Sequence, residues 1–286
     1  MTDYKNRGNK MKKSVNQAGR FMIMALLVIA ALLVLIPFLW MFMSSFKDNK
    51  ELYLAPWELP TIWRFENFRL AWEAGINKYL FNSIFVTVVS TLSSVFVSAM
   101  TAYPLSRLDF KGKKVIFLFV ISGMMLAPQV ALIPLYKLLQ AMRIYNTYFA
   151  MILPYIAYRI PFTTFLLWGY MLSIPNEVEE SARIDGCSYY KMFYKIIIPM
   201  SKPMIFTSVL LAARFIWNEF MFALVFTEDT ELNTIPLGLM ALKSDSGSNY
   251  PVLIAGLALT TIPMIILFLC IQKQFVRGLT AGSVKG

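Results

Sequence analysis

The sequence contains no histidine and only two cysteines, Cys187 and Cys270, and this scarcity excludes several kinds of site. Without histidine the chain has no Ser-His-Asp or Cys-His catalytic arrangement and no His-ligated metal. The two cysteines do not form a C-x-x-C pair, so neither a metal site nor a disulfide framework is indicated. The phosphate-binding pattern G-x-x-x-x-G-K-[ST] is also missing, so any ATP hydrolysis must come from another polypeptide.

Charged residues are scarce as well. They make up 15% of the chain, against about 25% in ordinary soluble domains, whereas 58% of the residues are apolar. A soluble globule of 286 residues could not hide so much apolar surface, so the class is integral membrane protein. The charges that give the net +11 lie between long apolar stretches and form no basic stripe with interleaved aromatics, which favours a topology signal over nucleic-acid binding.

Six mostly apolar segments are long enough to cross a hydrocarbon core of about 30 Å, which takes about 20 helical residues. They are residues 21–43, 79–103, 115–136, 145–170, 204–227 and 252–271. The first is too long for the apolar part of a signal peptide and lacks an A-x-A cleavage site, so we expect it to be retained. The second is rich in Ser and Thr, whose small side chains allow close helix packing, so we expect it at the centre of a bundle.

Lys and Arg are concentrated in the two tails, in the loop after the second segment and in the loop at residues 172–203, which predicts that both termini are cytoplasmic. The chain therefore reads as an all-α membrane protein with six transmembrane helices. It has a tail (1–20), a first helix (21–43), an extracytoplasmic loop (44–78), a core of five helices (79–272) and a second tail (273–286). The outer loop contains Trp57, Trp63 and Trp72, which suit either the membrane interface or an external partner.

The loop at residues 172–203 has helical signals of its own. Asn176 is suited to cap a helix, and Glu179 three residues later completes a capping-box pattern. Gly186 is suited to end that helix in a left-handed conformation. The loop therefore predicts a first short helix from Asn176 to just before Gly186.

A second short helix is expected after the glycine, from Ser188 to about residue 197. Pro199 and Pro203 would stop this helix before the next membrane segment begins. The residues alone leave two interpretations open: the pair of helices packs on the ends of the chain's own membrane helices, or it forms a docking surface for a cytoplasmic partner.

The spacing of this loop resembles the EAA motif of ABC importer permeases. Glu180-Ser181-Ala182, three residues, Gly186, nine residues and Ile196-Ile197-Ile198-Pro199 follow the pattern E-A-A-x3-G-x9-I-x-L-P. Ser181 replaces the first Ala and Ile198 replaces Leu. Residues 182–186, the run Trp217-Asn218-Glu219-Phe220 and the ending 278–286 resemble the sugar-importing branch of the family, and the ending is similar to the tail of a maltose-type second permease.

This resemblance implies a type I ABC importer permease fold in the bacterial cytoplasmic membrane, and a transport subunit rather than an enzyme. It implies a second homologous permease, two ATPase subunits and an extracytoplasmic substrate-binding protein as partners, with a sugar, preferably an oligosaccharide, as substrate. ATP and Mg would be bound by the ATPase, so this chain would hold no cofactor. ATPase closure would drive the membrane helices between inward- and outward-facing states.

The resemblance also implies roles for individual residues. In the EAA loop, Glu180 would be a charged anchor on the ATPase, Ser181 and Ala182 the close-contact surface, and Gly186 the turn. The full set of expected coupling residues is Glu180, Ser181, Ala182, Arg183, Asp185, Gly186, Ile196 and Pro199. The C-terminal tail would reach between the two ATPase subunits through Thr280, Gly282 and Lys285.

Three charges lie well inside the apolar segments, namely Arg159, Arg214 and Glu219. A charge at the centre of a bilayer costs about 2.5–3.5 kcal/mol on insertion scales, so such residues face a bundle interior or a water-filled cavity. We expect them to line or brace the translocation pathway, with an Arg159–Glu219 ion pair that could also be purely structural. Asn218, whose amide both donates and accepts hydrogen bonds, is the better candidate for sugar contact.

An ion-gradient-driven secondary transporter is the alternative function. It would need discontinuous helices or buried acids near the middle of the membrane, and only Glu219 meets this requirement in the sequence. No internal repeat is evident, which argues weakly against transporters built from inverted repeats.

Overall fold

The computed structural model describes residues 2–245 and 249–281, with side chains from residues 19–243 and 249–278, and this part of the chain is helical without any strand. The helices are α1 (Thr2–Ser44), α2 (Asn49–Leu54), α3 (Glu66–Ala71), α4 (Asn77–Arg107), α5 (Lys113–Ser122), α6 (Leu132–Ala141), α7 (Tyr148–Leu172), α8 (Asn176–Ile184), α9 (Tyr189–Met192), α10 (Ile198–Met200), α11 (Lys202–Trp217), α12 (Met221–Phe226), α13 (Ile235–Asp245) and α14 (Tyr250–Ala281). The expected all-α class is confirmed.

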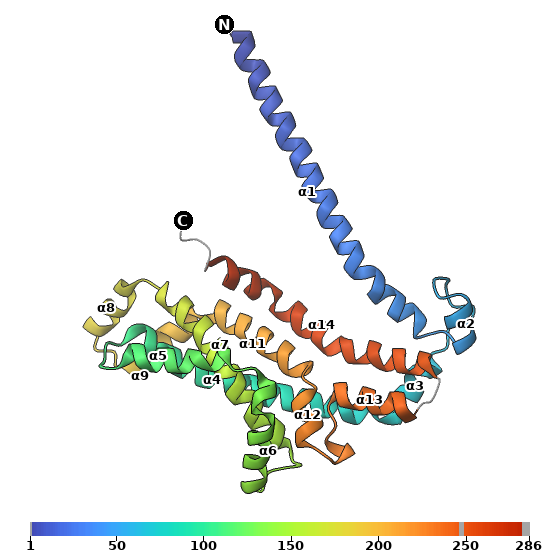
Figure 1. Cartoon of the computed structure of the whole chain (residues 1–286). Coiled ribbons are helices and arrows are strands. Elements are labelled where there is room, and N and C mark those ends of the chain that lie inside the picture. The colour runs from blue at the N-terminus through green and yellow to red at the C-terminus, as the bar shows by residue number, and fades with distance from the viewer. Residues whose placement is uncertain (1, 246–248, 282–286) are drawn as a thin grey trace.

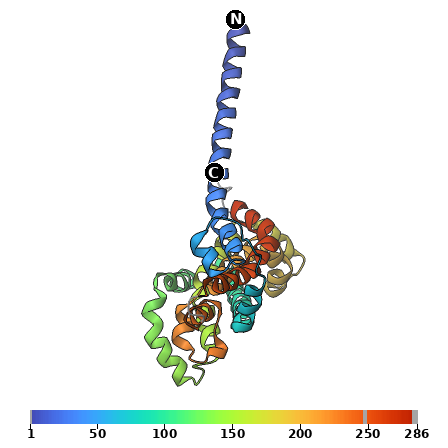
Figure 2. The ribbon, with the colours of Figure 1, turned by 90° about the vertical axis from the view of Figure 1, so that its right-hand side faces the viewer.

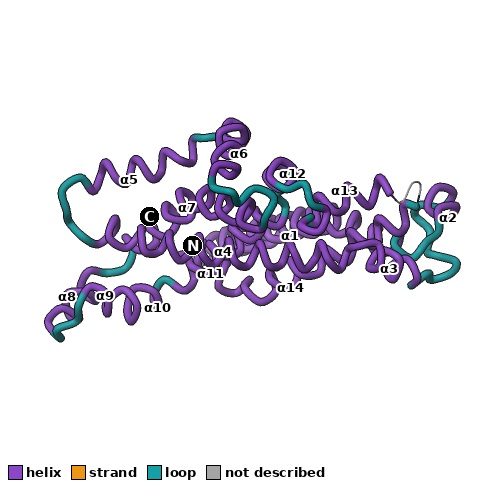
Figure 3. The backbone as a smooth tube through the Cα atoms, turned by 90° about the horizontal axis from the view of Figure 1, so that it is seen from below, coloured by secondary structure: helices purple, strands orange, loops and turns teal. Residues whose placement is uncertain are grey.

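The long helices α4, α7, α11 and α14 form an elongated bundle (Figure 1). We name its two ends by the helices found there. The α8 end carries α8, α9 and the C-terminal ends of α4 and α14, and the α3 end carries α2, α3 and α13. The view from below shows α5 along one edge of the bundle and α14 along the opposite edge (Figure 3).

The helix expected at the centre of the bundle is there. α4 packs most extensively against α7 and also contacts α11. Several hydroxyl side chains of α4 are buried, namely Ser83, Thr87, Ser90, Thr91, Ser94 and Ser98. Ser98 Oγ donates a hydrogen bond to the Ile160 carbonyl of α7 at 3.3 Å. Small side chains therefore let two backbones approach closely, as the sequence predicted.

α1 stands away from the bundle. It leaves at the α3 end and carries the N-terminus far from the other helices (Figures 1 and 2). Its apolar stretch Gly19–Ser44 is long enough to span a membrane, and none of its most apolar window is buried within the chain. Residues 2–20, which we expected as a tail, continue this helix.

The third and fifth apolar segments are not continuous helices, which corrects the expectation for residues 115–136 and 204–227. After α5 the chain makes a 3-10 turn, then Leu126 and Ala127 adopt extended backbone before Pro128 begins a new helical turn (Pro128–Ala131). A residue before proline is disfavoured in helical conformation, which explains the break at Ala127. The two halves meet at 94°. In the fifth segment, α11 ends at Trp217 and α12 starts at Met221.

Four helical stretches are long and apolar enough to cross a membrane, or up to six if each of two bent pairs is one span. The four are Gly19–Ser44, Glu66–Arg107, Tyr148–Leu172 and Tyr250–Gly278. The bent pairs are Lys113–Met125 with Pro128–Ala141, and Tyr189–Met200 with Lys202–Trp217. The last helix runs to Ala281, so the first part of the expected tail at 273–286 is helical.

The loop at residues 44–78 has a fixed shape at the α3 end. The buried Lys47 donates from Nζ to the carbonyls of Ala55 (2.7 Å) and Pro56 (3.1 Å). Asp48 caps α2 by accepting the Glu51 amide hydrogen bond at 2.8 Å, which lowers the pKa of the Asp48 carboxyl. Trp57, Trp63 and Trp72 of this loop are exposed. A position at the membrane interface and a contact with an external partner both remain predictions for the loop.

Candidate functional site: the α8–α10 element and a membrane cavity

α8 is held to the bundle by Arg107, the last residue of α4. The Arg107 guanidinium donates to the carbonyls of Met171 and Ile174 (2.6 Å) and to Asn176 Oδ1 (2.6 Å). Its Nε lies 3.0 Å from Glu179 Oε1, and the two side chains are only 4% and 8% exposed. One buried side chain therefore joins the end of α4, the end of α7 and the first turn of α8.

The capping box expected for α8 does not form. Asn176 is the first residue of the helix, Pro175 occupies the cap position, and no side chain caps the helix there. The side chains of Asn176 and Glu179 are instead occupied by Arg107. In the sequence Arg107 indicates only membrane topology, because no local pattern shows that its partners lie more than sixty residues away.

The C-terminal end of α8 has the expected turn. Gly186 adopts φ +74°, in the left-handed region. Its N–H donates to the Arg183 carbonyl at 3.0 Å, and the Cys187 N–H donates to the Ala182 carbonyl at 2.9 Å. This is the double hydrogen-bond pattern of a glycine-terminated helix, and the prediction of a left-handed Gly186 is confirmed.

The second short helix also forms, but it does not stop at Pro199. Ser188 Oγ caps α9 by accepting the Lys191 N–H at 3.4 Å. A π-helical stretch (Phe193–Ile197) leads into α10, where Pro199 lies within the first turn and is tolerated there. The chain turns by 75° at Ser201 before α11 begins. The boundary is therefore at Ser201, between Pro199 and Pro203.

The α8–α10 element has one face on the bundle and one exposed face. Ala182, Phe193 and Ile197 are buried against the chain. We expected Ala182 on an open contact surface, but its burial places it on the inner face of α8. The other expected coupling residues Glu180, Ser181, Arg183, Asp185, Gly186 and Pro199 are exposed, and Ile196 is half-buried. Ile184, which we did not single out, is 88% exposed although it is apolar.

The C-terminal end of α14 reaches the same end of the bundle (Figure 1). At Gly278 a Cβ would lie 2.9 Å from the Pro203 carbonyl, so α14 packs closely on the start of α11 there. Thr280 belongs to α14 by its backbone, whereas Gly282 and Lys285 lie outside the described residues. The expected tail contact remains a prediction.

The four candidate pathway residues line one cavity of about 750 Å³. Arg159 comes from α7, Arg214 from α11, and Asn218 and Glu219 from the break between α11 and α12. The remaining walls are Pro128, Gln129, Phe162, Leu211, Phe215, Phe220 and Met221. The cavity is therefore lined by the non-helical stretch between α11 and α12 and by the 3-10 turn that follows the break after α5.

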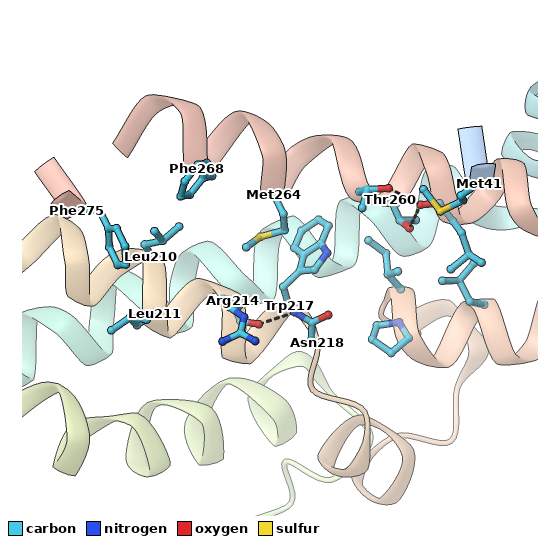
Figure 4. Close-up of a pocket in the computed structure, with 15 residues that line it drawn as sticks. Met41, Leu210, Leu211, Arg214, Trp217, Asn218, Thr260, Met264, Phe268 and Phe275 are labelled. Carbon is cyan, nitrogen blue, oxygen red and sulfur yellow. Dashed lines mark hydrogen bonds between the residues drawn. The ribbon is translucent and has the colours of Figure 1, made fainter. Parts of the chain in front are cut away.

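A second cavity of about 700 Å³ lies between α11, α13, α14 and the end of α1. Figure 4 shows Trp217, Met264 and Phe268 around it, with Arg214 and Asn218 at its edge. Asn218 Nδ2 donates to the Arg214 carbonyl at 2.8 Å. Arg214 and Asn218 line both cavities, so the C-terminal end of α11 separates them.

Arg159 and Glu219 form no ion pair among the described residues, which answers the question of their pairing that the sequence left open. Glu219 Oε2 accepts a hydrogen bond from the Tyr155 hydroxyl at 2.6 Å, and both Glu219 oxygens lie 3.0 Å from the backbone nitrogen of Phe222, the second residue of α12. Glu219 thus ties the break to α7 and caps the short helix that follows.

Comparison with known proteins identifies the family. Residues 94–281 match the family described as binding-protein-dependent transport system inner membrane component. The probable ABC transporter permease YurM of Bacillus subtilis (strain 168) is 50% identical over 250 residues, covering 87% of this chain and 83% of that protein. The trehalose/maltose permease MalG of Thermococcus litoralis is 36% identical over 91% of this chain and 94% of its own length.

A crystal structure of a bacterial ABC transporter that imports the acidic polysaccharide alginate has the same fold. Its matching chain has a TM-score of 0.75 at 25% identity, over 88% of this chain and 94% of that one. The shared fold confirms the expected type I permease architecture.

The fold and the matched region define an inner-membrane permease of the ABC transporter class, and the chain belongs to the family of binding-protein-dependent transport system inner membrane components. It is a transport subunit and not an enzyme, as expected. The secondary-transporter alternative is not supported. The interrupted helices, which we expected only in that alternative, occur here in an ABC permease, so this criterion does not separate the two classes.

Proposed function

We propose that this chain is one of two homologous permeases in a sugar importer, working with two ATPase subunits that bind ATP and Mg and with an extracytoplasmic substrate-binding protein. Relatives named for sugar uptake support the sugar. They include MalG and the arabinooligosaccharide permease AraQ of Bacillus subtilis (strain 168), which is 35% identical over 90% of this chain. An oligosaccharide is the preferred substrate.

We further propose six membrane crossings with both termini cytoplasmic. α11 alone has 16 residues, a rise of about 24 Å, which falls short of a core of about 30 Å. We assign the missing length to α12, which follows the break. The third crossing is the bent pair Lys113–Met125 with Pro128–Ala141, whose 94° angle makes it a broken span rather than a straight helix. An even number of crossings returns the C-terminus to the side of the N-terminus, which the distribution of Lys and Arg assigns to the cytoplasm.

The observation that carries the proposed coupling role is the Arg107 contact. The inner face of α8 is locked to α4 and α7 through Arg107 and Glu179, whereas its outer face is open. A partner that moves α8 therefore moves both helices as a unit. Since α7 also contributes Arg159 to the 750 Å³ cavity, movement at the α8 end reaches the cavity wall.

The cavity suits a translocation pathway for a sugar. Phe162, Phe215 and Phe220 provide apolar surface, while Gln129 and Asn218 provide amides that donate and accept. The break between α11 and α12 is further support, because non-helical backbone at membrane depth is tolerated where it is buried in protein or lines a water-filled cavity.

The coupling role is tested by placing a charge on the exposed face of α8. Ile184→Asp alters a side chain that is 88% exposed in this chain, so insertion and folding are expected to be unchanged. If α8 docks on the ATPase, the buried carboxylate should reduce co-purification of the co-expressed ATPase at least tenfold and abolish uptake.

Leu54→Asp is the matched control, since Leu54 is 84% exposed but lies at the α3 end. This variant should leave ATPase co-purification unchanged. Normal co-purification of the Ile184→Asp protein, or an equal loss in both variants, would contradict docking through α8.

A further inference from the structure

Arg159 is a buried cation without a counter-ion in the described part of the chain. The residue is 7% exposed and lies in the wall of the 750 Å³ cavity. Its guanidinium carbon is 4.9 Å from the Phe162 ring centre and 5.2 Å from the Phe215 ring centre. These rings attract the charge but cannot accept its hydrogen bonds in the geometry of a carboxylate.

The hydrogen-bonding capacity of Arg159 is largely unused. Its Nε and Nη2 are buried and have no hydrogen-bond partner among the described residues. A guanidinium carries five N–H donors and stays protonated in proteins. A buried charge without an ionic partner is costly, so an anion in the cavity would add to the stabilisation that the two rings provide.

The lining of the cavity carries more positive than negative charge. Arg214 is a second cation in its lining, and Glu219 is the one acid there. The Glu219 oxygens are already occupied by the Tyr155 hydroxyl and the Phe222 amide, both neutral donors. Glu219 forms no ion pair with either arginine among the described residues, and two cations against one acid leave the lining with an excess of positive charge.

We propose that this cavity binds the carboxylate of an acidic sugar, with Arg159 as its primary partner and Arg214 as a second cation. The inference rests on the proposed function and narrows its substrate class from sugars in general to saccharides that carry an anionic group. A guanidinium can match a carboxylate with two parallel N–H···O bonds, whereas a neutral hydroxyl would meet only one of them. Nε and Nη2 of Arg159 are enclosed by protein in this structure, so the carboxylate must turn the side chain toward the cavity to engage them. Asn218 and Gln129 remain available for the hydroxyl groups of the same sugar.

Ligand binding to the purified complete transporter, without its binding protein, tests this proposal. The probes are glucuronate, galacturonate and mannuronate, each compared with the neutral hexose of the same configuration in thermal-shift titrations. At least one acid should stabilise the transporter at a concentration about tenfold lower than its neutral counterpart, which corresponds to about 1.4 kcal/mol. Raising the salt concentration should reduce this preference.

Variants assign the preference to Arg159. Arg159→Gln should abolish it, and Arg159→Lys should retain part of it because the charge remains while the bidentate geometry is lost. Arg143→Gln is the control, since it removes an exposed arginine outside the cavity lining and should leave the preference intact.

Three results would overturn the proposal. The acids and neutral hexoses act equally or not at all; the Arg159→Gln protein keeps the preference; or Arg159→Gln releases the second permease from the complex, which would assign the missing acceptor to that subunit. If one of these occurs while Ile184→Asp still blocks ATPase binding and uptake, the permease role stands and only the anionic substrate is refuted.

Discussion

Replacing Arg107 by Met removes the link between α8 and the bundle while keeping a side chain of similar length. Three oxygens lose their donor: the Met171 and Ile174 carbonyls and Asn176 Oδ1. Glu179 is left as a buried, unpaired carboxylate, since its side chain is 8% exposed. Removing one partner of a buried ion pair costs about 3–5 kcal/mol.

The α8 element has a way to limit this cost. If α8 detaches, Glu179 reaches water and the penalty is replaced by the free energy of docking α8. The destabilisation by Arg107→Met cannot exceed the smaller of two free energies: the penalty of burying the unpaired Glu179 carboxylate, and the free energy lost when α8 detaches. We therefore expect Arg107→Met to release α8 rather than to unfold the bundle. Amide hydrogen exchange of residues 176–186 in the complete transporter should accelerate by about 10- to 100-fold, corresponding to about 1.4–2.8 kcal/mol.

Function should change in a specific way in the Arg107→Met protein. ATP hydrolysis should persist while uptake falls, because the ATPase would move α8 without moving α4 and α7. Arg107→Lys should be intermediate, since one ammonium cannot bridge all four acceptors. In the double variant with Glu179→Gln, the loss should be smaller than the sum of the single losses by about 1–3 kcal/mol.

Unchanged exchange and unchanged uptake in the Arg107→Met transporter would refute this reasoning. So would strictly additive losses in the double variant, because they would show that Arg107 and Glu179 do not stabilise one another.

Two glycines give further predictions. A Cβ at Gly186 would face open space, but the residue has φ +74°. We therefore expect Gly186→Ala to cost about 1–2 kcal/mol in conformational free energy and to reduce uptake clearly, with normal membrane insertion. Gly186→Asn should reduce uptake less, because Asn tolerates the left-handed conformation better. Gly238→Ala would place a Cβ within the Tyr79 ring, so we expect a loss of about 1–3 kcal/mol in thermal unfolding that Tyr79→Leu partly restores. Normal uptake by Gly186→Ala, or no destabilisation in Gly238→Ala, would contradict the respective argument.

The features that the sequence predicted correctly are local. Hydropathy located the apolar segments. The Ser and Thr residues of α4 identified the central helix, because small side chains allow a neighbouring helix to approach closely. The end of α8 followed from Gly186 alone, since a left-handed residue and its two hydrogen bonds involve only adjacent turns. The start of the second short helix at Ser188 is local in the same sense, since Ser188 Oγ accepts the Lys191 N–H in the first turn of α9.

The features that it missed depend on contacts between distant parts of the chain. Asn176 and Glu179 match a capping box, yet Arg107 competes for the same side chains across more than sixty residues. Arg159 and Glu219 have opposite charges at similar depth, yet Tyr155 and the Phe222 amide occupy Glu219. The break at Ala127 was signalled by Pro128, but hydropathy averaging over twenty residues concealed it.

The separation of Arg159 from Glu219 bears on why the cavity is built as it is. A direct ion pair would have neutralised two membrane charges with no other residue, and both side chains line the same cavity. Instead Glu219 is satisfied by neutral donors and fixes the α11–α12 break to α7, which leaves Arg159 uncompensated. Glu219 therefore stabilises the conformation of the α11–α12 break whether or not the cavity is occupied. Arg159, which has no ionic partner in the described part of the chain, is free to bind an anion. In this interpretation Glu219 has a structural role and Arg159 a binding role.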